Sequence, residues 1–122
     1  MASEGLHESA KHLRRKTRDM HRALVSLGEE LEAVDWYRQR ADACADAELE
    51  AILLHNMREE MEHAAMLIEW LRRKDAHFHD QLQRYLFSRA PVTEIETEAS
   101  AAAGSDAGEE TAMGMTIGSL KE

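Results

Sequence analysis

The chain has 122 residues, of which 32% are charged, and its net charge is −9. That length suits one small domain, and the acidic balance disfavours nucleic acid and anionic membranes as partners while suiting cations. Scarce glycine (6) and proline (1), with 5% aromatic residues, favour an all-α protein. The single cysteine, Cys44, excludes an internal disulfide framework and fits a reducing compartment. Because no apolar run is typical of a signal peptide or a membrane span, we expect a cytoplasmic protein that binds neither membrane nor nucleic acid.

The first predicted element is a long helix from about Leu6 to Ala41, a stretch without proline. Residues at alternating spacings of three and four form an apolar seam with one carboxylate in it: Met20, Ala23, Leu27, Glu30, Val34, Tyr37, Ala41 and Cys44. Gly28 within this helix should cost about 1 kcal/mol relative to alanine. Such a glycine is kept either for a close backbone approach or for no strong reason.

A short connection over residues 42–46 leads to a second helix, with Asp46 as its N-cap and its end near Lys74. The seam of this helix contains Leu49, Leu53, Asn56, Glu60, His63, Leu67 and Trp70. A short connection makes the two helices antiparallel, which brings Glu30 level with Glu60 and His63. Such a hairpin cannot cover its own apolar stripe, so two hairpins should pack into a four-helix layer.

A third, shorter helix should begin after Asp75 and stop before Pro91. We expect it to bury Phe78, Leu82, Tyr85 and Leu86. The predicted fold is therefore all-α, with an antiparallel two-helix hairpin followed by a short helix.

The rest of the chain predicts a tether that ends in a docking segment. Residues 93–112 form an acidic run with few large apolar side chains, which predicts a flexible linker. Apolar residues return in 113–122, where Ile117 and Leu120 would anchor the segment in a groove of another protein. The alternative is a C-terminal overhang without a function.

Glu30, Glu60 and His63 occupy seam positions at one level, and no Lys or Arg shares these seams. An unpaired buried carboxylate is costly, and two chains about a two-fold axis would gather four carboxylates and two imidazoles. Two divalent cations remove that conflict, and this ligand set suits Fe(II), Mn(II) or Zn(II). One Glu with Glu-x-x-His is half of a di-iron site in four-helix bundles, so we expect an active site shared by two chains. The alternative is a coiled-coil assembly whose buried polar layer fixes the register.

Three weaker features lie near these residues. Glu29 and Glu32 flank Glu30 off the seam, where they gather cations or form an ordinary solvated face. A stripe beside the second seam contains His55, Glu59 and Glu62, and spacing alone favours surface charge there over a peripheral metal site. Tyr37 lies on the seam, where its hydroxyl would contact the ligands, although a tyrosine in a helix interface is more often simply core.

These patterns together resemble the encapsulated ferritins, iron-oxidising cargo proteins of encapsulin nanocompartments. The resemblance rests on residues 29–37, on His55-Asn56, on residues 59–66 and on residues 69–73. The terminal Ile117-Gly118-Ser119-Leu120-Lys121 is similar to encapsulin-targeting peptides.

The resemblance implies a ferritin-like half-bundle over residues 1–92, a linker over 93–112 and a targeting peptide over 113–122. Two half-bundles would dimerise into a four-helix bundle, and the dimers would form a ring-shaped homo-oligomer. The ferroxidase centre would be a di-iron site formed by residues matching Glu30, Glu60 and His63, with Trp36 and Tyr37 close by. Residues matching Glu29 and Glu32 would form the site where metal enters.

The resemblance also implies a peripheral metal site at His55, Glu59 and Glu62. Calcium or another divalent cation is the expected occupant of these secondary sites. The chain lacks the second helix pair of ordinary ferritins, and Gly28 stands where the family would have a larger residue.

The expected function is that of a ferroxidase that oxidises Fe(II) to Fe(III) and supplies iron for mineral storage. Dioxygen, or a peroxide derived from it, would accept the electrons. The protein would work inside an encapsulin nanocompartment in the cytoplasm, bound to the shell protein through its C-terminal peptide. The alternatives are a non-enzymatic helical adaptor or structural oligomer docked to a shell protein, and a di-manganese or zinc site.

Overall fold

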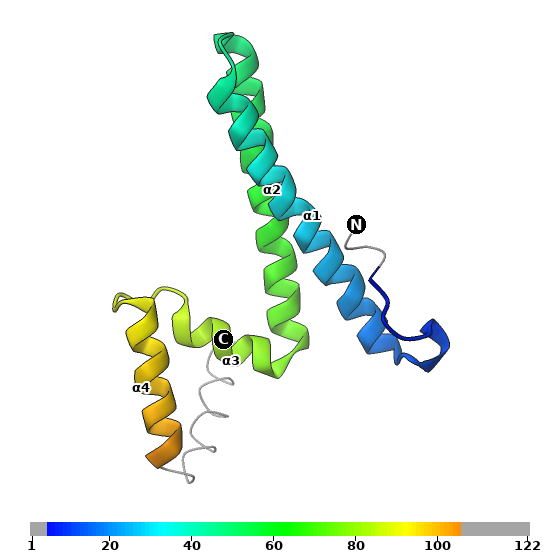
Figure 1. Cartoon of the computed structure of the whole chain (residues 1–122), viewed down its shortest axis with the longest axis vertical. Coiled ribbons are helices and arrows are strands. Elements are labelled where there is room, and N and C mark those ends of the chain that lie inside the picture. Colours follow the sequence, from blue (N-terminus) through cyan, green and yellow to red (C-terminus); the bar gives the residue numbers. More distant parts are fainter. Residues whose placement is uncertain (1–4, 106–122) are drawn as a thin grey trace. The chain divides into compact units, whose positions relative to one another are not determined.

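The described part of the chain is entirely helical. A computed structural model describes residues 5–105, and within this range no residue is in a β-strand. The elements in order are η2 (Ala10–His12), α1 (Arg15–Ala43), α2 (Ala47–Lys74), α3 (Ala76–Tyr85) and α4 (Val92–Ser105) (Figure 1). The chain divides into two compact units, Met1–Leu71 and Arg72–Glu122. The predicted all-α class is confirmed.

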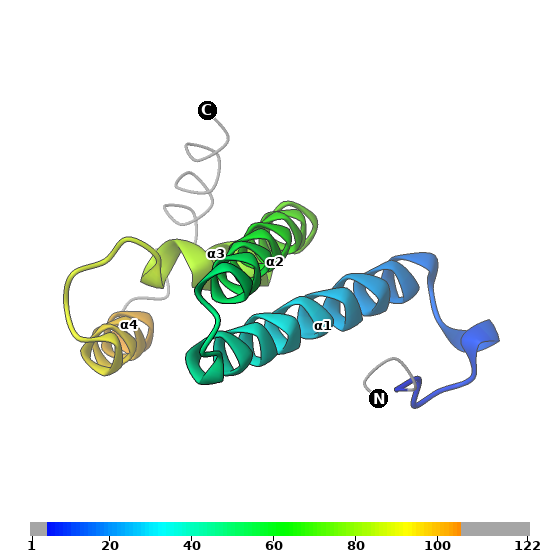
Figure 2. The same ribbon diagram turned by 90° about the horizontal axis from the view of Figure 1, so that it is seen from above.

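The first unit is built on the hairpin of α1 and α2. The two helices lie side by side next to their connection and diverge toward the N-terminal end of α1 (Figures 1 and 2). Asp46 caps α2 as predicted, since its Oδ1 accepts a hydrogen bond from the Leu49 N–H at 2.8 Å. The antiparallel hairpin is therefore confirmed.

The predicted start of the first helix at Leu6 is wrong. The helix α1 begins at Arg15, after the single 3₁₀ turn of η2. Every residue from Gly5 to His12 is exposed, so no apolar face there packs against a second element and extends the helix. Arg14, at the N-cap of α1, makes no side-chain cap hydrogen bond.

The seam of α1 matches the prediction better than that of α2. All eight predicted seam residues of α1 are buried or half-buried, with Ala23 and Ala41 buried. On α2 the buried residues are Met57, Ala64 and Leu71, which follow the predicted seam positions by one residue. The face that α2 buries is thus rotated from the predicted one, and Glu60 and His63 lie at its edge. Dimerisation stays a prediction.

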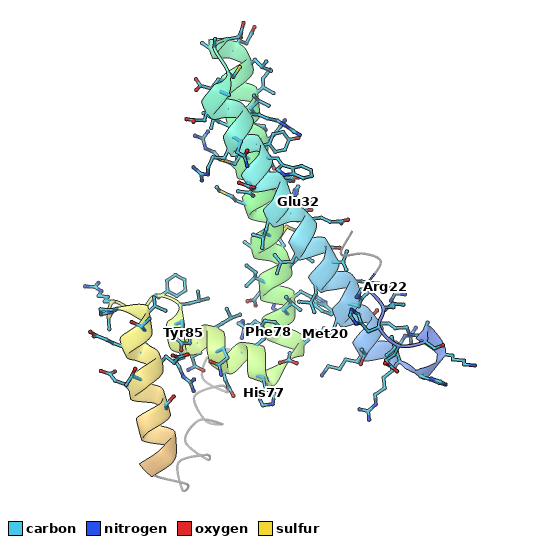
Figure 3. All side chains as sticks on the ribbon, in the orientation of Figure 1. Met20, Arg22, Glu32, His77, Phe78 and Tyr85 are labelled. Atoms are coloured by element: carbon cyan, nitrogen blue, oxygen red, sulfur yellow. The ribbon has the colours of Figure 1, made fainter. Side chains whose placement is uncertain are left out.

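In the second unit, α3 has the predicted place but a different buried side. Asp75 Oδ1 accepts from the Phe78 N–H at 2.8 Å and caps the helix. Phe78 and Leu86 are exposed and Leu82 and Tyr85 are half-buried, so the prediction that all four are buried is wrong (Figure 3). The buried residue is His79, whose Nδ1 lies 2.7 Å from Arg72 Nη1.

The predicted flexible linker 93–112 is partly wrong. Helix α4 spans Val92–Ser105 and contacts α3. Alanine and glutamate are strong helix formers, and the Pro91 carbonyl accepts from the N–H groups of Glu94 and Ile95. Low apolar content made the segment look unable to join a core, but it did not exclude a helix. The targeting peptide 113–122 lies outside the described residues, and the domain division stays a prediction.

No helix in the described range is both long and apolar enough to span a membrane.

Candidate metal centre

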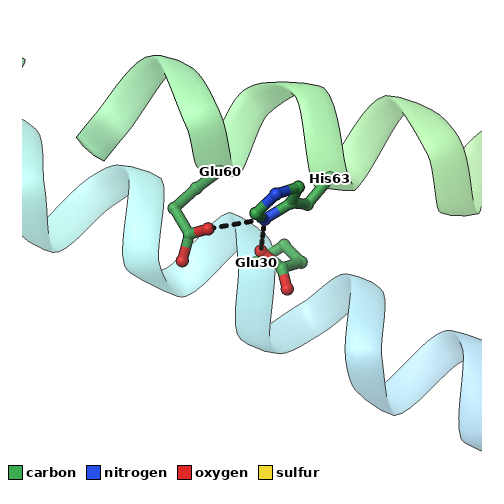
Figure 4. Close-up of side chains that lie close together, drawn as sticks. All are labelled: Glu30, Glu60 and His63. Carbon is green, nitrogen blue, oxygen red and sulfur yellow. Dashed lines mark hydrogen bonds and ion pairs between the residues drawn. The ribbon is translucent and has the colours of Figure 1, made fainter. Parts of the chain in front are cut away.

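The two long helices bring Glu30, Glu60 and His63 together (Figure 4). Glu30 comes from the middle of α1, while Glu60 and His63 are one turn apart on α2, where a spacing of three puts both on one face. One ligand atom from each residue lies within 4.8 Å of the others. Within residues 5–105 this is the one such group of three or more potential ligands, so the predicted trio is found as a cluster within a single chain.

His63 connects the two carboxylates. Its Nδ1 lies 2.8 Å from Glu60 Oε1 and 3.4 Å from Glu30 Oε2. The carboxylate side chains are 24% and 25% exposed, and the imidazole is 46% exposed. The cluster is therefore sheltered on the carboxylate side and open to solvent at the histidine.

The charges of the cluster shift the protonation of the imidazole. The pKa of His63 is raised, first because its side chain hydrogen-bonds to Glu60; desolvation lowers it, and the negative charges of Glu30 and Glu60 raise it. A proton held there neutralises part of the charge of the two carboxylates. The two carboxylates therefore favour the protonated, cationic form of the imidazole.

Glu30 has the least satisfied oxygen of the cluster. Its Oε2 is buried without a hydrogen-bond partner in the part of the chain that the structure describes, and 3.4 Å to His63 is longer than a good hydrogen bond. A buried carboxylate oxygen without a donor is costly, and a metal ion would remove that cost. Two carboxylates and one imidazole fit Fe(II), Mn(II) or Zn(II).

One chain supplies three ligand residues, which is half the usual set for two metals in a helical bundle. A two-metal centre therefore needs a second chain or several water ligands. The exposed imidazole of His63 leaves one side of the cluster open for a second chain or for water. The shared, two-chain site stays a prediction.

The structure places the secondary candidates outside this cluster. Glu29 and Glu32 are exposed on α1, and Glu62 is exposed on α2. His55 Nε2 lies 3.4 Å from Glu59 Oε1, with both side chains largely in solvent. Since these five residues form no group of three potential ligands within the described range, their metal-binding roles stay predictions.

Tyr37 is half-buried on α1 and lies next to a cation that the sequence reasoning missed. The Arg40 guanidinium carbon is 5.6 Å from the centre of the Tyr37 ring and 5.9 Å from that of Trp36. Spacings of three and four along one helix were the available signal for this arrangement. No hydrogen bond joins Tyr37 to the three ligands in the described structure, so its catalytic role stays a prediction.

Comparisons with known proteins agree on one family. Residues 5–89 match the EncFtn-like family. An encapsulated ferritin-like protein of Rhodospirillum rubrum is 51% identical over 128 residues, which cover 98% of this chain and 90% of the relative. A ferritin-like protein of Thermotoga maritima is 53% identical over 94 residues, 77% of this chain and 82% of the relative.

Two further matches extend this result. The encapsulin nanocompartment cargo protein EncC of Myxococcus xanthus is 32% identical over 104 residues, 80% of each chain. The crystal structure of a protein from Nitrosomonas europaea has a TM-score of 0.70 and 58% identity, and the match covers 72% of this chain and 97% of that one. Both sequence and backbone therefore support the helical architecture that carries the candidate metal centre.

Proposed function

The chain belongs to the EncFtn-like family of encapsulated ferritin-like proteins, and from this premise we propose that it is a ferroxidase housed in an encapsulin shell. The observation that carries the proposal is the convergence of Glu30, Glu60 and His63 from two helices, with ligand atoms within 4.8 Å of one another. Fe(II) is the substrate, and Fe(III) destined for mineral storage is the product.

A second copy, related by a two-fold axis, completes the site. It brings its own three ligands, so that four carboxylates and two imidazoles hold two iron ions. Glu60 would be shared between the two irons, and Glu30 and His63 would each hold one of them. Joined hairpins also cover apolar surface that one hairpin leaves exposed.

The chemistry is a one-electron oxidation at each iron. Two Fe(II) ions give up two electrons, and dioxygen accepts them with two protons from solvent, which yields hydrogen peroxide. The clustered carboxylates lower the free energy of Fe(III) more than that of Fe(II), because the extra positive charge lies beside them. His63 must release its proton before its Nδ1 binds iron.

The secondary residues support this reaction from outside the centre. Glu29 and Glu32, exposed on α1, collect Fe(II) and pass it to the centre, and Tyr37 contacts the ligand shell from the assembled interface. The exposed pair of His55 and Glu59, with Glu62, holds a peripheral calcium or other divalent cation.

The product needs an enclosed space that this small fold does not provide. The Rhodospirillum rubrum relative is described as encapsulated and the Myxococcus xanthus relative as encapsulin cargo. By analogy, residues 113–122 bind the shell protein of a nanocompartment in the cytoplasm and keep a homo-oligomeric ring of dimers inside it. A non-enzymatic adaptor docked to the shell is the competing function.

Iron oxidation by the full-length protein tests the proposal. Fe(II) is added without oxygen, air is admitted, and ferric absorbance is compared with that of iron alone. Glu30→Gln and Glu60→Gln should each remove the excess rate, because each loses a charged ligand at nearly unchanged shape. Glu48→Gln, an exposed carboxylate of α2 outside every proposed site, should keep it.

The same experiment separates the enzyme from an adaptor. An adaptor shows no excess rate to lose, and an unaltered rate in both ligand variants would contradict the assigned site. Deletion of residues 113–122 should leave iron oxidation unchanged but abolish co-purification with the shell protein. Retained co-purification would contradict the docking role of the peptide.

A further inference from the structure

Residues 11–22 form a cluster of positive charge, although the protein as a whole is acidic. This basic segment contains six basic side chains and one acidic side chain, a net charge of +5, whereas the rest of the chain has a net charge of −14. Such a reversal of charge over a short stretch marks a surface suited to a different partner from the rest of the molecule. The six basic residues, all exposed, are Lys11, Arg14, Arg15, Lys16, Arg18 and Arg22.

Acidic side chains of the protein leave most of this charge unneutralised. Arg22, labelled in Figure 3, has its Nη1 2.7 Å from Asp19 Oδ1. Within residues 5–105, the other five basic side chains of the segment make no ion pair with an acidic residue. Exposed cations that have no partner within the protein are available to an anion from outside it.

The position of the basic segment opposes the stability of α1. The first turn of α1 has no acidic residue, and Arg14 at its N-cap makes no side-chain cap hydrogen bond. Because the first turn of a helix has partial positive charge, cations there raise the free energy of the helix. Arg14 and Arg18 are four residues apart, so their like charges also repel. Local features that oppose folding without compensation are expected at functional sites, and a bound anion would offset both costs.

The spread of the charges indicates a chain of phosphate groups rather than a single ion. Arginine and lysine are the residues that most often bind phosphate oxygens. At 1.5 Å per residue, Arg15 and Arg22 are about 10 Å apart along α1, and Lys11 and Arg14 precede them in the chain. One phosphate group can contact only part of such a row, whereas a linear polyanion can contact all of it.

The composition around the basic segment disfavours nucleic acid as that polyanion. Residues 5–22 contain no Phe, Trp or Tyr, the side chains on which proteins stack the bases of single strands. A broad duplex would also bring phosphates near the acidic residues 29–71 of the same unit, which have a net charge of −9. A thin, flexible chain avoids this repulsion, because charges more than about 8 Å away are largely screened at physiological ionic strength.

We infer that the basic segment is a binding surface for inorganic polyphosphate. Its exposed guanidinium and ammonium groups bind successive phosphates of the chain, and no base or sugar is needed for recognition. The surface uses none of the three candidate metal ligands and does not require iron. It therefore goes beyond the proposed ferroxidase, and the two proposals fail independently.

Calorimetric titration of the full-length, metal-free protein with a short linear polyphosphate tests the inference. The affinity of the native protein should fall as salt rises, because each contacted phosphate releases a counterion. The triple variant Arg14→Gln, Arg15→Gln and Arg18→Gln should bind about a hundredfold more weakly at about 0.1 M salt, and its logarithmic salt slope should be smaller by about two. It should melt no lower than the native protein, since it loses like charges. Native-like affinity of this variant would overturn the inference.

Two matched variants separate the charge of the segment from other effects. Replacing the same three arginines by lysine keeps the charge and should retain most of the affinity. A control that changes three exposed arginines elsewhere, Arg38→Gln, Arg58→Gln and Arg89→Gln, should bind polyphosphate as the native protein does. Equal weakening in this control would show that net charge alone holds the polyanion, and it would overturn the assigned surface.

Competition distinguishes polyphosphate from other sources of phosphate. A single-stranded oligothymidylate of equal charge should displace polyphosphate only weakly, because the segment offers no aromatic side chains to its bases. Orthophosphate at the same concentration of phosphate groups should displace still less. Tighter binding of the oligothymidylate would assign the surface to nucleic acid, and full displacement by orthophosphate would reduce it to a site for a single ion; either result would overturn the inference.

Discussion

If His63 is a metal ligand as proposed, a proton and a metal ion compete for its Nδ1. Its Nδ1 lies 2.8 Å from Glu60 Oε1 and 3.4 Å from Glu30 Oε2. A proton on this nitrogen would offset the repulsion of the carboxylates, as an iron ion would do with more charge. The residue that we propose as a metal ligand thus also offsets the charge of the two carboxylates when it is protonated.

The raised pKa of His63 has a defined consequence for pH. Its protonated form stabilises the folded, metal-free chain fully below the ordinary pKa of 6.5, and this stabilisation is lost as the pH rises through the raised pKa. Fe(II) binding should strengthen over the same window, because the competing proton leaves. An NMR titration of the His63 ring, without metal, should show the raised pKa in the native chain and a lower one in Glu60→Gln.

Glu48→Gln is the control for this titration, because Glu48 is exposed and does not belong to the cluster. Its His63 pKa should equal that of the native chain. A His63 pKa that does not change in Glu60→Gln would show that the hydrogen bond to Glu60 is not its main cause.

Spacing was enough to predict which ligands meet, because helical period and hairpin length fix the level of Glu30 against Glu60 and His63. It was not enough for His79 and Arg40. The position of each side chain depends on how its helix is rotated about its axis. It also depends on a nearby partner, which is Arg72 for His79 and the Trp36 and Tyr37 rings for Arg40. Small errors in the assumed face change which of two adjacent residues is buried, as the burial of His79 in place of Phe78 shows.

Helix ends were predictable where a side chain fixes them. Asp46 and Asp75 each accept a hydrogen bond from an N–H three residues on, and both were identifiable from the sequence. No comparable cap marks the start of α1, and α4 follows from helix propensity rather than from an apolar face. Neither the start of α1 nor α4 can therefore be predicted from the spacing of apolar residues.

A substitution at Gly28 measures the effect of helix propensity in α1. A Cβ at this residue would have no neighbour within 4 Å, so Gly28→Ala should raise the free energy of unfolding by about 1 kcal/mol. Urea unfolding at a concentration where single copies dominate would measure it. Ala51→Gly, at an exposed position within α2, should lower the same free energy by about as much.

Packing between copies would explain why Gly28 is present. If another copy packs closely against α1 at this residue, Gly28→Ala should stabilise the single chain and weaken association. If association is unchanged, glycine has no packing role there. Destabilisation of the single chain would contradict the open space around Gly28.

At the scale of the whole molecule, the hairpin leaves large apolar side chains uncovered. Leu24, Leu31, Ile52 and Met66 are each at least 45% exposed, and the three candidate ligands are half of the usual set for two metals. The sequence predicts both the uncovered apolar face and the half set of ligands, since each follows from the residues along the two helices. It does not predict how copies are arranged, because that depends on surfaces that meet between chains.

Iron should therefore drive pairing as well as undergo oxidation. A ligand that binds only the paired form stabilises it by about 2.7 kcal/mol when present at a hundredfold excess over its Kd. Adding Fe(II) without oxygen should raise the mass of the native oligomer in light scattering, and Zn(II), which has no redox chemistry, should do the same. His63→Ala should respond to neither metal, whereas Glu48→Gln should respond to both. If the native mass stays constant with both metals, pairing depends on apolar contact alone, and the site would then be completed before the iron arrives.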